Sequence, residues 1–415
     1  MRGKRRKISN RIIESNAAGA DIVQSIEDEG APTTKSLGKA ASDSRLSQLY
    51  ESTEFKVVQE RNDFLLHQIL DFVQEKRWIN LTPEYQRRKR WDNQKKSLLI
   101  ESLLMNLPVP PIFLYEVEPA RYEVMDGQQR LNAIIEFYDD QLPLSGLETW
   151  KGLVGRTYTS CPPRIKRGID RRKISAVILS ADTSNLEGLS SKDIRREVFE
   201  RLNTGGEKLN AQELRNCLYS GPMNELIIEL SRLDEFTDIW NIPSYSRFEK
   251  RKRAAIEPRK SNNLYKTMAD SQIVLRFFAF REKSSLKGSV RAILDQFMET
   301  NQSPTTAELR QFSNQFESCL SLARNIFEGD TFRLPESRGN KLSVPLYDAV
   351  MIALYLELRQ KAEILHAKRS IISLLSKSLE RQKTYETIVG KPNTASAIQD
   401  RINHVRRIIR RAIAS

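Results

Sequence analysis

Residues 122–137, YEVMDGQQRLNAIIEF, change from one structural period to another within a few positions. Tyr122 to Met125 is a short, mostly apolar run, and a second such run, PIFLYEV, precedes it at residues 111–117. The residues between the two runs are polar or turn-forming, so we expect two strands joined by a turn at residues 118–121. The stretch therefore predicts a strand that leads through Asp-Gly into a helix.

The residues after Gly127 have the spacing of an amphipathic helix. Apolar side chains recur at i, i+3, i+4 and i+7, namely at Leu131, Ile134, Ile135 and Tyr138. Asp126 stands where an N-cap belongs and Gln129 follows three residues later, which predicts a capping box. The first turn of such a helix suits an anion, and Arg130 adds a fork of donors that matches phosphate geometry. Two interpretations stay open: a phosphate site, or a simple cap and turn with solvated glutamines.

The composition favours a polyanionic partner. The chain has 415 residues, enough for two or three domains, a formal net charge of +14 and a pI of about 9.6. Each basic run taken alone is best interpreted as a solvated face, but together they predict at least one phosphate-facing surface. These runs lie at residues 1–11, 87–96, 163–173, 247–260 and 401–411.

Cysteine and histidine usage argues against a zinc site or another histidine-rich metal site. The three cysteines are far apart and form no CxxC pair, which also argues against a disulfide framework and fits a reducing cytosol; they are Cys161, Cys217 and Cys319. The histidines are not paired at ligand spacing, so a histidine–asparagine–histidine nuclease is not easily built from this chain; they are His67, His366 and His404. No apolar run could span a bilayer and no signal peptide is visible, so we expect a cytoplasmic protein without a membrane partner.

The pattern along the chain predicts an α+β protein. Residues 1–45 are polar and predict a disordered basic arm, residues 46–220 a mixed α/β domain, and residues 221–415 a helical domain. In the α/β part we expect helices at 60–76 and 97–106, and a strand at 173–180. Further helices are expected at 193–202, 211–220, 271–280, 306–327 and 345–362, with a long helical tail from residue 380.

Three motifs carry candidate chemistry, and the first is PEYQRRKRW at residues 83–91. Gln86 and Arg87 could bind phosphate while Trp91 stacks on a base. For Trp91 alone, burial for packing within a basic turn is the simpler interpretation. In the second motif, DGQQR at residues 126–130, Asp126 could hold a divalent ion rather than cap the helix. Either glutamine could position an attacking water.

The third motif is FERLNTGGEKLNAQELRN at residues 199–216. Its glycines, Gly205 and Gly206, would let the backbone approach a ligand closely. Asn210 with Glu213 predicts a capping box that opens a helix. Polar residues then crowd one short stretch, and we expect a binding site there; they are Gln212, Glu213, Arg215 and Asn216.

The order of these motifs resembles the ParB-like domain at the N-terminus of GmrSD-type restriction endonucleases. PEYQR and Trp91 are followed by LLIESLLMNLPVPPIFL, then DGQQR, then FERLNTGG and LNAQELRN, over about residues 60–225. A weaker helical similarity continues to about residue 355. The resemblance implies a ParB/sulfiredoxin-like fold for the α/β part and a nucleoside triphosphate site at DGQQR, with control of attack on modified or foreign DNA in phage defence.

Carried over by position, the resemblance assigns site roles to individual residues. Those of the catalytic segment are Asp126, Gln128, Gln129 and Arg130, and those of nucleotide binding are Gln86, Arg87 and Gly127. The third motif is expected to border the same cleft through Arg201, Asn203, Thr204 and Gly205. Many relatives carry a C-terminal histidine–asparagine–histidine nuclease domain that this sequence lacks, which implies a standalone form whose cutting half is absent or supplied by a partner.

Three functions follow. The first is a DNA-associated protein that binds and hydrolyses a nucleoside triphosphate with Mg²⁺, Arg87 and Arg130 contacting the β- and γ-phosphates. The second is a non-catalytic DNA-binding module that nucleotide switches. The third is a subunit that recruits a separate nuclease, ranked last because DGQQR is intact. Self-association into a homo-oligomer is left open.

Overall fold

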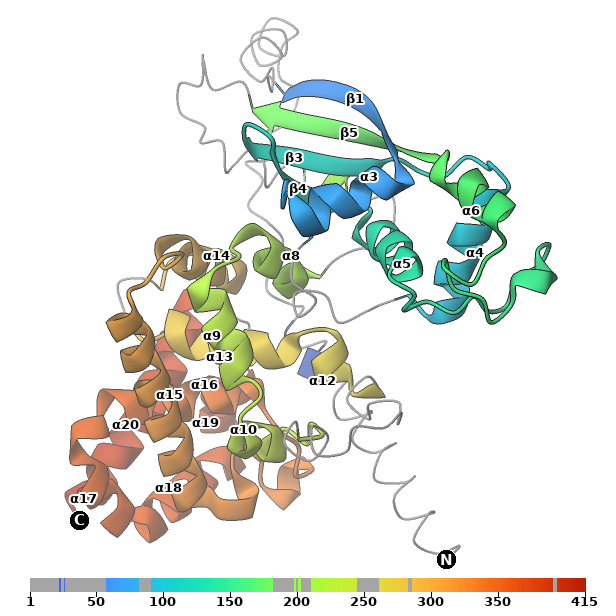
Figure 1. The fold of residues 1–415 in the computed structure, drawn as a ribbon. Coiled ribbons are helices and arrows are strands. Elements are labelled where there is room, and N and C mark those ends of the chain that lie inside the picture. Colours follow the sequence, from blue (N-terminus) through green and yellow to red (C-terminus); the bar gives the residue numbers. More distant parts are fainter. Residues whose placement is uncertain are drawn as a thin grey trace, which may run out of the picture. The chain divides into compact units, whose positions relative to one another are not determined.

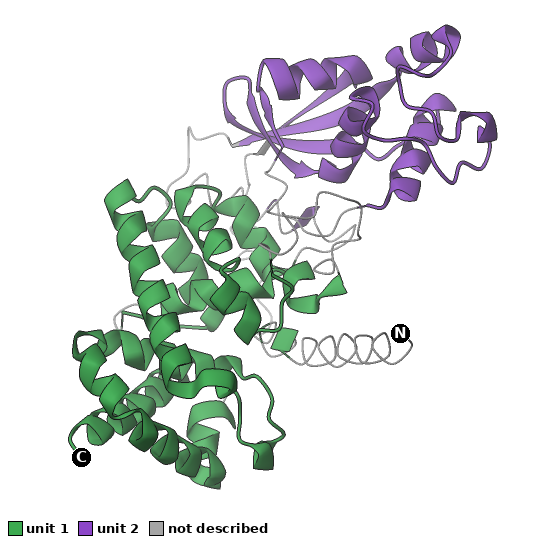
Figure 2. Cartoon of the chain, turned by 60° about the horizontal axis from the view of Figure 1, so that its bottom comes forward, with its two compact units in different colours: residues 1–34, 210–415 green, residues 35–209 purple. Residues whose placement is uncertain are grey.

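The computed structural model describes residues 22–23, 26, 57–81, 91–181, 198, 201–202, 210–244, 261–282, 286–390 and 394–415. Contacts divide the chain into two compact units, one of residues 35–209 and one of residues 1–34 with 210–415 (Figure 2). The first unit holds the sheet and the second is helical, so the chain has the expected α+β class. The division falls before Asn210, whereas the sequence placed it near residue 220.

A five-stranded sheet of order β1-β5-β3-β4-β2 forms the centre of the first unit (Figure 1). β1 pairs with β5, and β3 with β4, in antiparallel orientation, whereas β3 and β5, and β2 and β4, run parallel. The strand predicted at residues 173–180 is confirmed as β5. The bounds are β1 Val57–Leu65, β2 Ile79–Asn80, β3 Ile112–Glu118, β4 Arg121–Asp126 and β5 Lys173–Ala181.

The hairpin of β3 and β4 confirms the turn predicted at residues 118–121. Glu118 and Arg121 are paired neighbours, and the Ala120 N–H donates to Oε1 of Glu116 at 3.1 Å. Ala120 itself has a φ of 60°, which the turn requires. The pairing places Asp126, the last residue of β4, opposite Phe113 of β3. This register fixes where the DGQQR motif begins.

The single helix expected at residues 60–76 is wrong in its first part. β1 continues to Leu65 because its nine residues all pair with β5. The helix α3 (Leu66–Leu70) begins only after the Leu66 N–H has donated to the Arg172 carbonyl at 3.0 Å, and the π-helical turn η1 (Asp71–Glu75) follows it. Pairing with a strand more than a hundred residues away overrides the local helical spacing.

Helices pack on one face of the sheet and share a single apolar core with it. Besides α3, these are α4 (Asn93–Leu104), α5 (Gln128–Tyr138) and α6 (Pro163–Asp170). A short 3₁₀ turn, η3 (Lys151–Leu153), lies in the loop that follows α5. The opposite face of the sheet also carries buried side chains: Tyr115, Met125, Val177 and Leu179. The sheet is therefore apolar on both faces.

α4 buries two charged side chains, and each has a partner. The Lys96 ammonium donates to both carboxylate oxygens of Glu136 on α5, at 2.7 and 2.6 Å. The Glu101 carboxylate accepts the backbone N–H groups of Glu148, Thr149 and Trp150 at 2.7 to 3.1 Å. Burial raises the pKa of Glu101, but these three N–H groups outweigh it and leave the pKa below its ordinary value.

The second unit is a helical bundle around its own core. α13 is buried along its whole length. None of the helices in the described part of the chain has both the length and the apolarity that crossing a bilayer requires. The helices are α8 Ala211–Leu218, α9 Pro222–Leu230, α10 Asp234–Ile239, α12 Asn263–Lys266, α13 Ala269–Ala279, α14 Val290–Thr300, α15 Thr306–Phe327, α16 Val344–Leu356, α17 Lys361–His366, α18 Lys368–Glu380, α19 Gln382–Tyr385 and α20 Ala395–Ile413.

The sequence pattern predicted a helix of this unit accurately where a capping box marks its start. The helix predicted at 306–327 is confirmed as α15, and Thr305 with Glu308 forms its capping box. The helix expected at 345–362 ends instead at Leu356, because Glu357 leaves helical geometry and turns its carboxylate towards arginines of α20. The continuous tail expected from residue 380 is broken between α18 and α20 by α19 and a π-helical turn, η11 (Glu386–Gly390).

Part of the expected disordered arm belongs to this core. Ile22 and Ile26 are only 5% and 2% exposed, and Val23 packs beside them. The prediction of disorder over residues 1–45 is therefore wrong at these three positions. They are apolar residues within a polar segment, and the helical unit supplies the apolar surface that the segment itself lacks.

Asp348 of α16 lies between two buried arginines. Its carboxylate accepts Nε and Nη2 of Arg276 at 3.0 and 2.5 Å, and Nη1 of Arg401 lies 3.8 Å from it. All three side chains are at most 1% exposed. Burial lowers the pKa of Arg401 to about 10, although the charge of Asp348 opposes this. One carboxylate thus balances two guanidinium groups inside the bundle.

Asp348→Ala should lower the free energy of unfolding by about 3 to 5 kcal/mol, because both buried guanidinium groups lose their counter-ion. Urea denaturation followed by fluorescence of Trp240, which is buried in the same unit, measures this. Asp330→Ala, at an exposed carboxylate of that unit, is the matched control and should change stability by less than about 0.5 kcal/mol. Equal effects of the two substitutions would contradict this assignment.

Glu101→Gln should weaken the fold in a pH-dependent way. The folded pKa of Glu101 is depressed, so its stabilising effect is full above about pH 4.5 and is lost as the pH falls through the lowered value. We expect a loss of about 1.5 to 3 kcal/mol near neutral pH, which shrinks in acid. Urea denaturation of both proteins from about pH 7 to about pH 3 tests this. A stability difference that stays constant over that range would contradict the prediction.

Candidate functional site

The connection between β4 and α5 is one residue long. Asp126 ends β4, Gly127 has a φ of +99° and is the N-cap, and Gln128 begins α5. A Cβ at Gly127 would lie 2.5 Å from Cγ2 of Ile112, so both the conformation and the packing require glycine. The capping box predicted for Asp126 and Gln129 is therefore wrong: Asp126 remains in the strand because it pairs with β3.

Arg130 fastens this connection to the sheet. Its Nη2 donates to Oδ2 of Asp126 at 2.9 Å and to the carbonyl of Pro111 at 3.1 Å. The arginine side chain is 13% exposed and that of Asp126 is 44% exposed. The Nε atom of Arg130 is buried and has no hydrogen-bond partner. Its Nη1 atom also has no partner among the described residues, but it is not among the buried atoms that lack one. Nη1 is thus the guanidinium nitrogen of Arg130 that is neither buried without a partner nor engaged by a described residue.

Gln129 brings the first two motifs together. Its side chain is 8% exposed, and its Oε1 accepts the backbone N–H of Trp91 at 3.1 Å. The Trp91 ring is half-buried against the core, as the simpler interpretation expected, and Nζ of Lys95 lies 4.9 Å from its centroid. PEYQRRKRW therefore ends beside DGQQR, although residues 82–90 lie outside the described part of the chain.

Gln128 occupies the first position of α5. Its side chain is half-buried and takes part in polar contacts of its own. No side chain of the described residues caps this helix, and its first intrahelical bond runs from the Leu131 N–H to the Gly127 carbonyl at 2.9 Å. The N–H groups that precede Leu131 and the positive end of the helix dipole lie next to Asp126 and Arg130.

The remaining predicted site residues are less well placed. Arg201 is helical and exposed. The other predicted nucleotide-binding residues lie outside the described residues: Gln86, Arg87, Asn203, Thr204 and Gly205. The structure therefore brings together Asp126, Gly127, Gln129 and Arg130, and leaves the proposed border of the cleft as a prediction.

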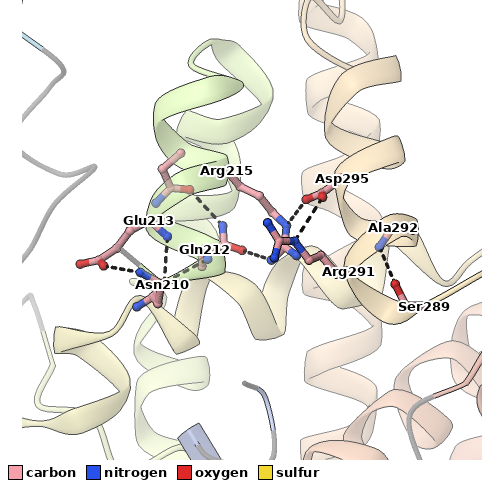
Figure 3. Close-up of polar contacts among 9 residues, drawn as sticks. Asn210, Gln212, Glu213, Arg215, Ser289, Arg291, Ala292 and Asp295 are labelled. Carbon is pink, nitrogen blue, oxygen red and sulfur yellow. Dashed lines mark hydrogen bonds and ion pairs between the residues drawn. The ribbon is translucent and has the colours of Figure 1, made fainter. Parts of the chain in front are cut away.

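The third motif opens α8 in the helical unit (Figure 3). The predicted capping box is confirmed: Oδ1 of Asn210 accepts the N–H groups of Gln212 and Glu213, and Oε2 of Glu213 accepts the Asn210 N–H at 3.0 Å. The Asn210 amide also donates to the Thr267 carbonyl at 2.8 Å. This cap joins α8 to the start of α13.

The polar side chains of α8 are buried, so they do not form a surface site by themselves; the loop before them, on which the expected binding site also rested, lies outside the described residues. Arg215 donates its Nε to Asp295 of α14 at 2.7 Å and its Nη1 to Gln212 at 3.2 Å (Figure 3). Gln212 in turn donates to Asn216 at 3.0 Å. None of these α8 side chains is more than 1% exposed. They hold α8 and α14 together, and their polarity, which suggested a ligand, serves an internal network.

Sequence reasoning missed the backbone partners of the motif. Pro111 was predicted only as the first residue of a strand-forming run, yet its carbonyl is an acceptor for Arg130. Ile112 was assigned only to a strand, yet its side chain excludes any larger residue at position 127. A carbonyl oxygen has no signature in a sequence, so neither role could be found before the strands were paired.

Titration and metal binding add two observations. Burial, with the charges of Glu116 and Glu60, raises the pKa of Tyr122 on β4, so its phenol keeps its proton near neutral pH.

Within the described ranges, no three side chains of histidine, cysteine, aspartate or glutamate cluster as metal ligands would. Asp126 stands at the motif with Oδ1 unengaged by those residues.

Comparison with known proteins gives one match. Residues 66–220 match the family described as GmrSD restriction endonuclease, N-terminal domain. Neither a curated protein nor a solved structure matches the chain. The matched residues run from α3 through DGQQR to the capped start of α8, and so include each of the three motifs. This part of the chain belongs to the GmrSD N-terminal domain family, which indicates a component of a restriction-type system.

Proposed function

We propose that the chain binds a nucleoside triphosphate at the turn between β4 and α5, hydrolyses it, and acts with DNA in a phage-defence restriction system. The observation that carries this proposal is the N-terminus of α5, which has no side-chain cap among the described residues and adjoins Arg130, whose Nη1 no described residue engages. Backbone N–H groups at a helix start and an arginine fork are both suited to phosphate oxygens.

Asp126 fits the ion that accompanies a triphosphate. One of its carboxylate oxygens is engaged by Arg130, and nearly half of its side chain is exposed. Mg²⁺ is commonly held by one or two carboxylates together with the phosphates of the nucleotide, so a larger cluster of acidic ligands is not required. Asp126 would hold the ion, whose role is to neutralise phosphate charge.

The two glutamines have different roles in this proposal. Gln129 is engaged with the backbone of Trp91 and holds the first motif beside the turn. Gln128, one position earlier at the first residue of α5, is half-buried and is the glutamine that would orient a water for attack on the terminal phosphate. Gln86 and Arg87 would meet the nucleotide from the first motif, which ends at Trp91. The phosphate released is the product to be measured.

The ion pair at the turn also favours a second function, a nucleotide-controlled switch without hydrolysis. Arg130 links the end of β4 to the residue that precedes β3. A phosphate that competed with Asp126 for this arginine would release one of these links. The turn would then differ between the nucleotide-bound and nucleotide-empty protein, which is what a switch requires. A separate nuclease subunit would be the natural recipient of such a signal.

Phosphate release from each of the four ribonucleoside triphosphates, with Mg²⁺ and with or without duplex DNA, tests the first proposal. Arg130→Lys keeps the charge but not the planar group, and should reduce nucleotide affinity at least roughly tenfold because one ammonium cannot keep the contacts to Asp126 and Pro111 and also bind phosphate as Nη1 would. Arg121→Ala, an exposed arginine at the other end of β4, is the matched control and should bind as the wild type does.

The outcomes separate the two functions. If the wild type releases phosphate and both Asp126→Asn and Arg130→Lys abolish that release, the result supports hydrolysis at this turn. Binding of a triphosphate without release, lost in the same variants, supports the switch instead. Normal binding in both variants, with thermal unfolding unchanged, would exclude the turn as the nucleotide site.

A further inference from the structure

A basic depression lies on the C-terminal helix, in the unit that does not contain DGQQR. It measures about 500 Å³ and is lined mainly by α20, with one residue from η11. Figure 1 shows α20 within the helical unit. Three of the lining residues are arginines and one is acidic; the lining consists of Thr387, Asp400, Asn403, Arg406, Arg407 and Arg410. We call this surface the arginine pocket.

Two of its arginines are held in place from behind by one buried carboxylate. Oε1 of Glu357 accepts Nε of Arg406 at 2.5 Å and Nε of Arg410 at 2.7 Å. The Glu357 side chain is 6% exposed, so this oxygen is shielded from water. Nε of the third arginine, Arg407, donates to the Asn403 carbonyl at 3.3 Å. All three guanidinium groups are therefore oriented through the nitrogen nearest the chain.

This arrangement leaves the outer edge of each guanidinium group for a ligand. In the described part of the chain, Nη1 and Nη2 of Arg406, Arg407 and Arg410 have no hydrogen-bond partner, and the residues Arg407 and Arg410 are exposed. The side chains of Arg406 and Arg410 are 31% and 57% exposed. Planar donors fixed in advance lose less rotamer freedom when they bind the oxygens of a phosphate group.

The charges nearby favour an anion. Asp400 lies in the lining and has interactions of its own, and Glu357 lies behind it, so three guanidinium groups face two carboxylates. The carboxylate of Glu357 bonds only to Nε atoms on the inner side. The side that faces solvent therefore presents donors and an excess of positive charge.

We propose that the arginine pocket binds backbone phosphates of duplex DNA. Arg406 and Arg410 are one turn apart, about 6 Å along the helix axis, so the donors form a row rather than an enclosed cup. A row of exposed arginines suits a chain of phosphates, whose contacts position a protein on DNA without reading its sequence. The inference rests on the DNA association proposed above, but not on the nucleotide site.

Binding of the full-length chain to a fluorescent duplex, measured over a range of salt concentrations, tests the proposal. Arg407→Glu should weaken binding roughly tenfold and reduce the salt slope by about one, because one phosphate contact is lost. Arg407 is exposed and makes one backbone contact, so its replacement leaves Glu357 with both of its partners. Arg310→Glu on α15, an exposed arginine outside the pocket, changes the net charge equally and is the control.

Each outcome has a distinct meaning. A wild-type chain that does not bind DNA would overturn both this inference and the proposed DNA association. A wild-type chain that binds, with Arg407→Glu and Arg310→Glu equally weakened or unchanged, would overturn the arginine pocket alone. Loss of binding confined to Arg407→Glu, with thermal unfolding unchanged, supports it.

A free triphosphate offers the same phosphate chemistry, so a second arm separates it from DNA. Binding of a fluorescent triphosphate, in the absence of DNA, should be the same in Arg407→Glu and the wild type. If Arg407→Glu loses triphosphate affinity while DNA binding stays normal, the pocket is a nucleotide site and the proposal is wrong.

Discussion

The contacts of Arg130 hold together the part of the fold that the family motif defines. One guanidinium nitrogen bonds to the end of β4 and to the residue before β3, while the arginine itself stands in the first turn of α5. Gly127 makes this possible, because any larger residue there would collide with Ile112. The turn thus has a fixed shape before any ligand arrives, as a site that binds phosphate through backbone N–H groups requires.

Buried charges serve the same purpose elsewhere in both units. Glu101 fixes a loop to α4, Arg215 with Asp295 joins α8 to α14, and Asp348 balances two arginines within the bundle. A polar residue in a motif therefore does not by itself indicate a ligand. What distinguishes the DGQQR turn and the arginine pocket is that some of their guanidinium nitrogens have no hydrogen-bond partner among the described residues after the internal contacts have been made.

The elements that sequence reasoning predicted best are those specified by neighbouring residues. The β3–β4 hairpin, the capped start of α8 and the whole of α15 follow from turn, cap and period signals within a few positions. The helix expected at residues 60–76 failed because β1 pairs with β5, and the cap expected at Asp126 failed because that residue pairs with β3. A partner distant in the chain can reverse a local preference, and a local pattern carries no information about it.

The sequence by itself determined the α+β class, the three ordered motifs that identify the domain family, and the clusters of basic residues. Tertiary structure alone decided which members of these sets are buried in internal contacts and which lie nearer the surface. Of two adjacent glutamines, Gln129 is engaged inward and Gln128 stands at the helix start; of the arginines on α20, Arg401 is buried beside Asp348 while Arg407 is exposed. The physical reason is that burial and hydrogen bonding of a side chain depend on segments that folding brings to it from elsewhere in the chain.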